Sequence, residues 1–91
     1  MADIKIEKAH HLGREEAHRR LQQIETELNQ KYGVKLDWQG DQAQVHARGI
    51  SGLIVVEDER VSVDLKLGLP LWPIQGKLRS EIQQRVDRTL S

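Results

Sequence analysis

The sequence lacks several features that would assign a small protein to a functional class at once. It contains no cysteine, which excludes disulfide bridges, thiolate zinc sites and cysteine nucleophiles. Its 14 basic and 14 acidic residues give a formal net charge of zero. The chain as a whole therefore lacks the excess of positive charge that is typical of nucleic-acid-binding domains.

Long apolar segments are missing as well. The longest apolar run covers only residues 53–56, whereas a helix needs roughly 20 apolar residues to span a bilayer. Residues 1–8 lack the apolar core of a signal peptide. We therefore expect a soluble, cytoplasmic protein without a transmembrane segment.

Periodic apolar residues are what the sequence does contain, and such periodicity is typical of a folded domain. A length of 91 residues fits one domain with a modest core. We expect a single domain over 1–91, built from the following segments: a strand at 3–8, a helix at 13–32, a four-strand meander at 34–67, a loop with two prolines at 68–73 and a helix at 74–90.

Two segments show the apolar spacing of amphipathic helices. In the first, Ala17, Leu21, Ile24 and Leu28 recur at steps of four, three and four, and Gly33 is expected to end the helix in the left-handed conformation. In the second, the apolar residues recur every four positions: Ile74, Leu78, Ile82, Val86 and Leu90. Both segments are predicted to bury one face.

The segment between the helices alternates apolar and polar residues, which is typical of strands with one buried face. The connections between these strands are short, so the strands must pair antiparallel. We predict an α+β, two-layer fold in the order β-α-β-β-β-β-α, with both amphipathic helices on one face of an antiparallel sheet. The opposite face carries mixed charges, and a second copy of the chain could pair with it as a homodimer.

Polar residues with catalytic or metal-binding chemistry are few. His10, His11 and His18 lie near the start of the first helix, but their spacing favours solvated or capping side chains over a metal site. His46 is expected on the polar sheet face near Asp37 and Asp64, where a histidine–carboxylate pair could act as an acid and base. No motif supports a nucleophile, so we expect no catalytic residues, cofactor or metal.

An apolar cluster before the last helix is the most informative candidate site. Leu69, Leu71, Trp72 and Ile74 lie in a segment that Pro70 and Pro73 stiffen. If these side chains are exposed, they form an apolar tip that can contact a lipid, a polymer or a protein. If they are buried, they close the open end of the core, and the scarcity of large side chains favours this interpretation.

The order of these elements resembles a known family. The matching residues are, in chain order, Ile4-x-Ile6, His11-Leu12-Gly13, Tyr32-Gly33, Trp38-x-Gly40-Asp41, Gly49-x-x-Gly52, the alternating segment 61–69, and Pro73 with the terminal helix. The chain resembles the polyhydroxyalkanoic acid system proteins, small bacterial proteins associated with polyester storage granules. The resemblance implies a granule-associated or regulatory role in the cytoplasm and carries over no catalytic residue.

Three functions follow as hypotheses. The first is a non-enzymatic accessory protein of the polyhydroxyalkanoate system that contacts the granule surface or a granule protein through Leu69, Leu71, Trp72 and Ile74. The second is a small helix-grip-like domain that binds a fatty or hydroxyacyl ligand between helices and sheet. The third, an enzyme that uses His46 with a neighbouring aspartate, is the least supported.

Overall fold

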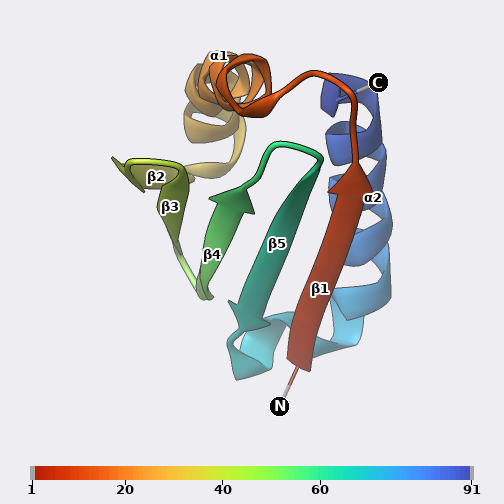
Figure 1. Ribbon diagram of the computed structural model, residues 1–91. Coiled ribbons are helices and arrows are strands. Elements are labelled where there is room, and N and C mark those ends of the chain that lie inside the picture. Colours follow the sequence, from red (N-terminus) through yellow and green to blue (C-terminus); the bar gives the residue numbers. More distant parts are fainter. Residues whose placement is uncertain (1, 91) are drawn as a thin grey trace.

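Strands and helices follow one another in the predicted order (Figure 1). The structure is a computed structural model that describes residues 2–90. The elements are β1 (Ala2–Ala9), α1 (Arg14–Tyr32), β2 (Lys35–Gln39), β3 (Gln42–Ala47), β4 (Ile50–Val56), β5 (Arg60–Leu67), η1 (Leu69–Ile74) and α2 (Gln75–Leu90). The predicted α+β class and element order are confirmed.

The strands form one antiparallel sheet in the order β1-β5-β4-β3-β2. Strands β2 to β5 are the predicted meander, and β1 adds to its far edge by pairing with β5, where Ile4 faces Leu65 and Ile6 faces Val63. The first strand of the chain therefore lies beside the last one, and α2 follows from β5 to pack against β1.

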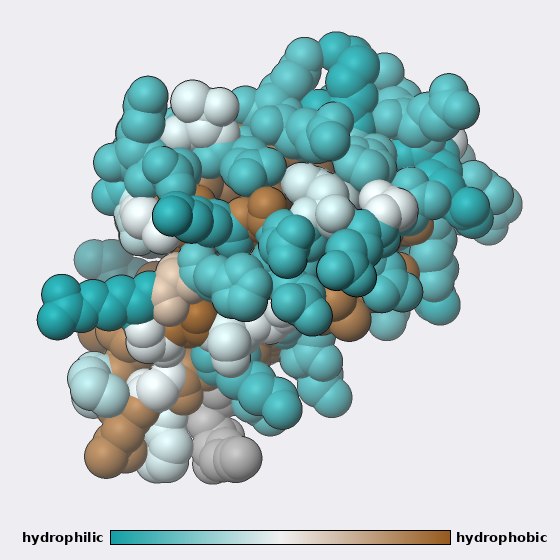
Figure 2. Space-filling view, turned by 90° about the vertical axis from the view of Figure 1, so that its left-hand side faces the viewer, coloured by the Kyte–Doolittle hydropathy of each residue, from teal (hydrophilic) through white to brown (hydrophobic). Residues whose placement is uncertain are grey.

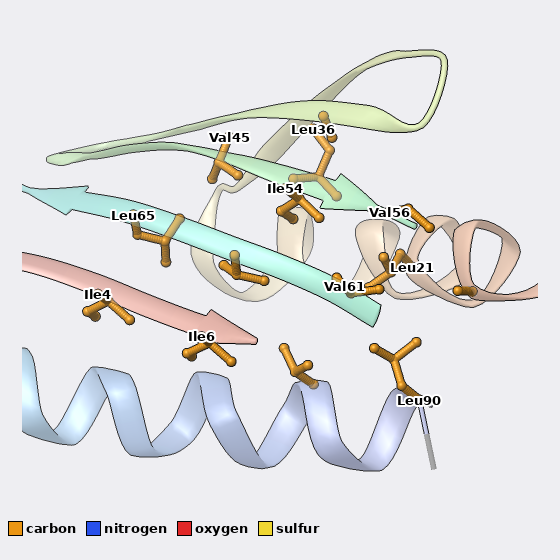
Figure 3. Close-up of a cluster of buried hydrophobic side chains, with 14 of the residues drawn as sticks. Ile4, Ile6, Leu21, Leu36, Val45, Ile54, Val56, Val61, Leu65 and Leu90 are labelled. Carbon is orange, nitrogen blue, oxygen red and sulfur yellow. The ribbon is translucent and has the colours of Figure 1, made fainter. Parts of the chain in front are cut away.

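The core lies between one face of the sheet and the two helices. Each strand alternates buried and exposed residues, and the buried ones share one face. Figure 3 shows Ile4 and Ile6 of β1 pointing toward α2. The helices contribute Ala17, Leu21, Val86 and Leu90 to the same cluster. The predicted apolar stripes therefore contain the buried residues of both helices, except that Ile74, predicted to begin the second stripe, lies in η1 before α2 and is exposed.

Helix α1 ends as predicted. Gly33 adopts the left-handed conformation with a φ of 67°, and its N–H donates to the carbonyl of Asn29 at 2.9 Å. A side chain at this backbone conformation would be strained, which explains the glycine between Tyr32 and Val34.

The segment predicted as an irregular loop at 68–73 is instead a 3₁₀ helix, η1, that runs directly into α2. Pro70 lies in its first turn, where a helix needs no N–H donor, so the proline is compatible with helical structure there. The two prolines correctly indicated that the sheet ends here, and the segment was therefore predicted as a loop. Prolines are nevertheless compatible with a short 3₁₀ helix. Within residues 2–90, neither helix is long and apolar enough to cross a membrane.

Candidate functional site

Segment η1 presents three apolar side chains to solvent at one end of the molecule. Leu69 is 67% exposed, Trp72 is 40% exposed and Ile74 is 44% exposed. We call these three residues the η1 tip. Figure 2 shows apolar surface at the lower end of the view, the end at which η1 lies in Figure 1. Exposed apolar groups that gather at one place favour a contact surface.

Leu71 differs from its neighbours because it packs against the hydrophobic core. Its Cδ1 lies 3.3 Å from the position that a Cβ would take at Gly49. Leu71 therefore closes the end of the core. One of the two interpretations above expected this role for all four residues of the cluster. The two interpretations apply to different residues of the same short segment.

Hydrogen bonds fix η1 to three other parts of the fold. The N–H of Gly68 donates to the carbonyl of Gly49 at 2.7 Å, and the Trp72 indole N–H donates to the carbonyl of Leu67 at 3.0 Å. Gln75, the first residue of α2, donates from Nε2 to the carbonyl of Asp3 at 2.9 Å. The tip is therefore held in place before any partner binds.

The second candidate site was the polar face of the sheet. The strand register places His46 opposite Lys35 and Ser51, whereas Asp37 lies opposite Gln44. Asp64 belongs to β5 and is separated from β3 by the whole of β4. Diagonal neighbours across a strand pair lie about 7–8 Å apart. His46 and Asp64 line the same depression on this face, whereas Asp37 does not, so the structure does not bring the three residues together as a catalytic group.

The three histidines near α1 occupy different environments. His11 is exposed, but His10 is buried, so His10 is not the solvated side chain that was one of the expectations. Its Nδ1 accepts from the N–H of Leu12 at 3.2 Å, and its Nε2 faces the carbonyl of Glu57 at 3.1 Å. Within residues 2–90, no group of three or more histidines or carboxylates could hold a metal ion.

Sequence reasoning missed a polar cluster around His18. The imidazole stacks on Trp38 with the ring centroids 4.0 Å apart, and its Nδ1 donates to the Asp41 carboxylate at 3.2 Å. The Nε of Arg14 lies 3.5 Å from a carboxylate oxygen of Asp41 and 3.5 Å from one of Asp58. Arg14 thereby joins the β2–β3 turn and the β4–β5 turn to the start of α1. The long separations in sequence explain why no local pattern indicated this cluster.

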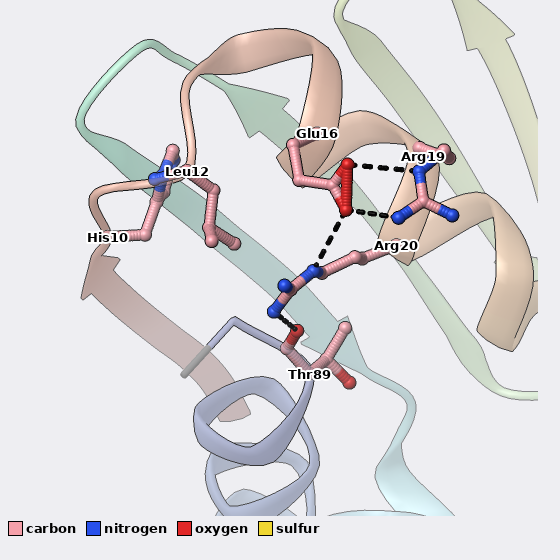
Figure 4. A network of polar contacts seen from close by, with 6 residues as sticks. All are labelled: His10, Leu12, Glu16, Arg19, Arg20 and Thr89. Atoms are coloured by element: carbon pink, nitrogen blue, oxygen red, sulfur yellow. Dashed lines mark hydrogen bonds and ion pairs between the residues drawn. The ribbon is translucent and has the colours of Figure 1, made fainter.

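A second network joins the two helices (Figure 4). Arg20 of α1 donates from Nε to Glu16 and from Nη1 to the carbonyl of Thr89, both at 3.2 Å. The guanidinium of Arg19, followed by that of Arg20, lowers the pKa of Glu16. The network fixes the C-terminal end of α2 beside α1 and uses no group that faces the η1 tip.

Two depressions lie on the surface of the described part of the chain. One, of about 420 Å³, is open and is lined by residues of β3 to β5 together with Gly49 and Gly68. The other, of about 490 Å³, lies on the polar face of the sheet, and its lining includes His46 and Asp64. Neither is lined by a residue of α1 or α2.

The fold and the sequence can be compared with known proteins. The fold is similar to the NMR structure of PA4090 from Pseudomonas aeruginosa, with a TM-score of 0.52 over 93% of this chain and 84% of that chain. At 9% identity this likeness concerns the fold alone. No curated protein matches the chain. The family model described as "Putative polyhydroxyalkanoic acid system protein (PHA_gran_rgn)" matches residues 4–90, and the chain therefore belongs to this family.

Proposed function

We propose that this chain is a non-enzymatic accessory protein of the polyhydroxyalkanoate system, which contacts the storage granule or a protein on its surface through the η1 tip. Membership of the family supports a role in that system. The single observation that carries the contact is the exposure of Leu69, Trp72 and Ile74 on one short, fixed segment. The proposal places the protein in the cytoplasm of granule-forming bacteria.

The chemistry of a polyester granule suits this tip. Such a granule presents an apolar polymer to water, and burial of apolar side chains contributes about 25 cal/mol for each Å² removed from water. Because hydrogen bonds and two prolines already fix η1, little conformational entropy is lost when the tip binds. Leu71 stays in the core and keeps the segment attached to the sheet.

The helix-grip alternative places a ligand between helices and sheet. A ligand pocket of that kind has a volume of roughly 300 Å³ or more and is mostly enclosed. The two depressions described above lie elsewhere, on the sheet and at its end. They give this alternative no support. A homodimer through the polar sheet face, where Leu53 is 37% exposed at the centre, stays a prediction.

A fluorescent fusion expressed in granule-filled cells tests the proposal. We expect the wild-type fusion to surround the granules and the variant Leu69→Ser/Ile74→Ser to become diffuse, since the variant lacks two of the three exposed apolar side chains of the tip. Fluorescence microscopy measures the fraction of signal at the granules.

The matched control is Tyr32→Ser/Leu53→Ser, which removes two apolar side chains that are exposed elsewhere. This control should still surround the granules. A wild-type fusion that stays diffuse contradicts the proposal, and so does a tip variant that locates like the wild type.

A further inference from the structure

The net charge of zero conceals an uneven distribution of ion pairs. In the part of the chain that the structure describes, lysines and arginines in ion pairs lie on α1, on the second half of α2, or where β1 ends and β5 begins: Lys8, Arg14, Arg19, Arg20, Lys31, Arg60 and Arg85. These pairs lie away from the η1 tip. The acidic partners in these pairs thus neutralise cations away from the tip.

Four exposed basic residues lie in the segments that adjoin η1, two on the sheet side and two on α2. Arg48 precedes Gly49, whose carbonyl binds Gly68. Lys66 is the penultimate residue of β5, shortly before η1, and Lys77 and Arg79 lie in the first turns of α2 just after it. Within residues 2–90, none of these four side chains forms an ion pair.

Acidic residues are nearly absent from this end. The sequence contains no aspartate or glutamate from 42 to 56 or from 65 to 80, the two segments that form the β3–β4 turn and the η1 region. The neighbouring carboxylates are Asp3, opposite Lys66 in the sheet, Asp64, which lines the same depression as Lys66, and Glu81, one helical turn after Lys77, and none of them forms an ion pair with these cations within residues 2–90. The apolar tip therefore has a positively charged rim, which we define as Arg48, Lys66, Lys77 and Arg79.

An apolar tip with a rim of unpaired cations matches an anionic amphiphilic surface. In a layer of anionic lipids, apolar side chains reach the acyl region while lysine and arginine side chains stay at the level of the phosphates. An acidic protein would have to supply a concave apolar pocket for a protruding tip of only three apolar side chains, whereas a lipid layer adapts to its shape. The shape and the charges together favour the lipid surface.

We infer that the η1 tip binds an anionic lipid surface, with Leu69, Trp72 and Ile74 entering the acyl region and the basic rim binding the headgroup phosphates. The inference rests on the proposed function and deepens it, because it adds that the granule surface which the same tip contacts carries anionic lipid over the polymer. It adds that charge, and not apolar contact alone, selects that surface.

Co-sedimentation with vesicles tests the inference. We expect the protein to bind vesicles of phosphatidylcholine mixed with phosphatidylglycerol much more tightly than vesicles of phosphatidylcholine alone. Neutralising the rim in R48Q/K66Q/K77Q/R79Q should weaken this binding by about fivefold for each cation. Raising the salt concentration above about 0.1 M should weaken wild-type binding too, because salt screens exposed charges.

The control variant is K8Q/R19Q/K31Q/R60Q, which changes the net charge equally but at the other end of the molecule. It should bind the mixed vesicles at least ten times more tightly than the rim variant. Equal binding of wild type to both kinds of vesicle, or equal loss in both variants, would overturn the inference. Tighter binding to poly-L-glutamate than to mixed vesicles would assign the rim to an acidic polypeptide and overturn it as well.

The two proposals can fail separately. If the fusion surrounds granules in a tip-dependent way while the protein ignores anionic vesicles, the granule contact stands and the lipid inference is wrong. If the protein binds anionic vesicles through its rim but the fusion stays diffuse in granule-filled cells, the inference stands and the granule contact is wrong.

Discussion

Gly52 shows how strongly one position of the sheet is constrained by its neighbour. It lies inside β4 opposite Leu65, and a Cβ built there would lie 2.2 Å from the carbonyl oxygen of Asp64 and 2.7 Å from Cδ2 of Leu65. The first of these atoms belongs to the backbone of β5 and cannot move aside alone. The glycine therefore permits the close approach of β4 and β5 on which the core depends.

Gly52→Ala should consequently destabilise the protein. The added methyl group forces the two strands apart, and overpacking of this kind costs about 2–3 kcal/mol of unfolding free energy. Urea denaturation measures the loss. The control is Gly76→Ala in the first turn of α2, where a Cβ meets nothing within 4 Å and stability should stay equal or rise slightly. Similar stability of both variants would contradict the crowding at Gly52.

At the scale of elements, the sequence predicted both helices because their apolar stripes depend only on local spacing. Ala17 and Leu21 of the first stripe are buried, as are Val86 and Leu90 of the second. Segment η1 was harder to predict because its structure depends on contacts with other elements. Leu71 packs beside Gly49, which is distant in sequence, and Trp72 donates to the carbonyl of Leu67 on β5. Local spacing carries no information about those contacts.

The division of η1 into a buried residue and an exposed tip predicts unequal effects of truncation. Leu71→Ala removes a half-buried side chain from the end of the core and should lower the unfolding free energy by about 1–2 kcal/mol. Leu69→Ala truncates the most exposed side chain of the tip and should change stability by less than about 0.5 kcal/mol. Thermal or urea denaturation compares them, and equal losses would contradict the division.

The contact between α1 and α2 predicts a dependence of stability on pH. Arg85 of α2 lies 2.9 Å from Glu27 of α1, and this hydrogen bond, together with one from Lys31, lowers the pKa of Glu27 below its ordinary value of 4.5. A carboxyl group with a lowered pKa in the folded state stabilises the protein above the ordinary pKa. That contribution disappears as the pH falls through the folded-state pKa.

Glu27→Gln should therefore be less stable than wild type at neutral pH, and the gap should narrow as the pH falls below about 4.5. Thermal denaturation at a series of pH values measures the gap. Glu15→Gln, on the same helix at an exposed position, should retain the wild-type pH dependence. A gap of constant size for Glu27→Gln would show that the ion pair does not join the helices.

At the scale of the whole molecule, the sequence predicted the composition of the candidate site but not its shape. Leu69, Leu71, Trp72 and Ile74 were recognisable as a cluster, whereas their separate burial depends on how β3, β4 and α2 meet around them. Whether Asp37, His46 and Asp64 lie close together depends on the strand register, and the alternation of apolar and polar residues alone does not determine that register. The cations near the tip could not be predicted from the sequence, because only the folded sheet brings the β3–β4 turn, which contains Arg48, next to Gly68 and η1.

The central claim, that the η1 tip is the surface that meets the granule, is tested most directly by the fluorescence of Trp72. The chain has two tryptophans, and the substitution Trp38→Phe leaves Trp72 as the single reporter while an aromatic ring remains beside His18. When isolated granules are added, we predict a blue shift of the Trp72 emission and protection from a soluble quencher. Emission and quenching that stay unchanged at granule concentrations that bind the protein would contradict the claim.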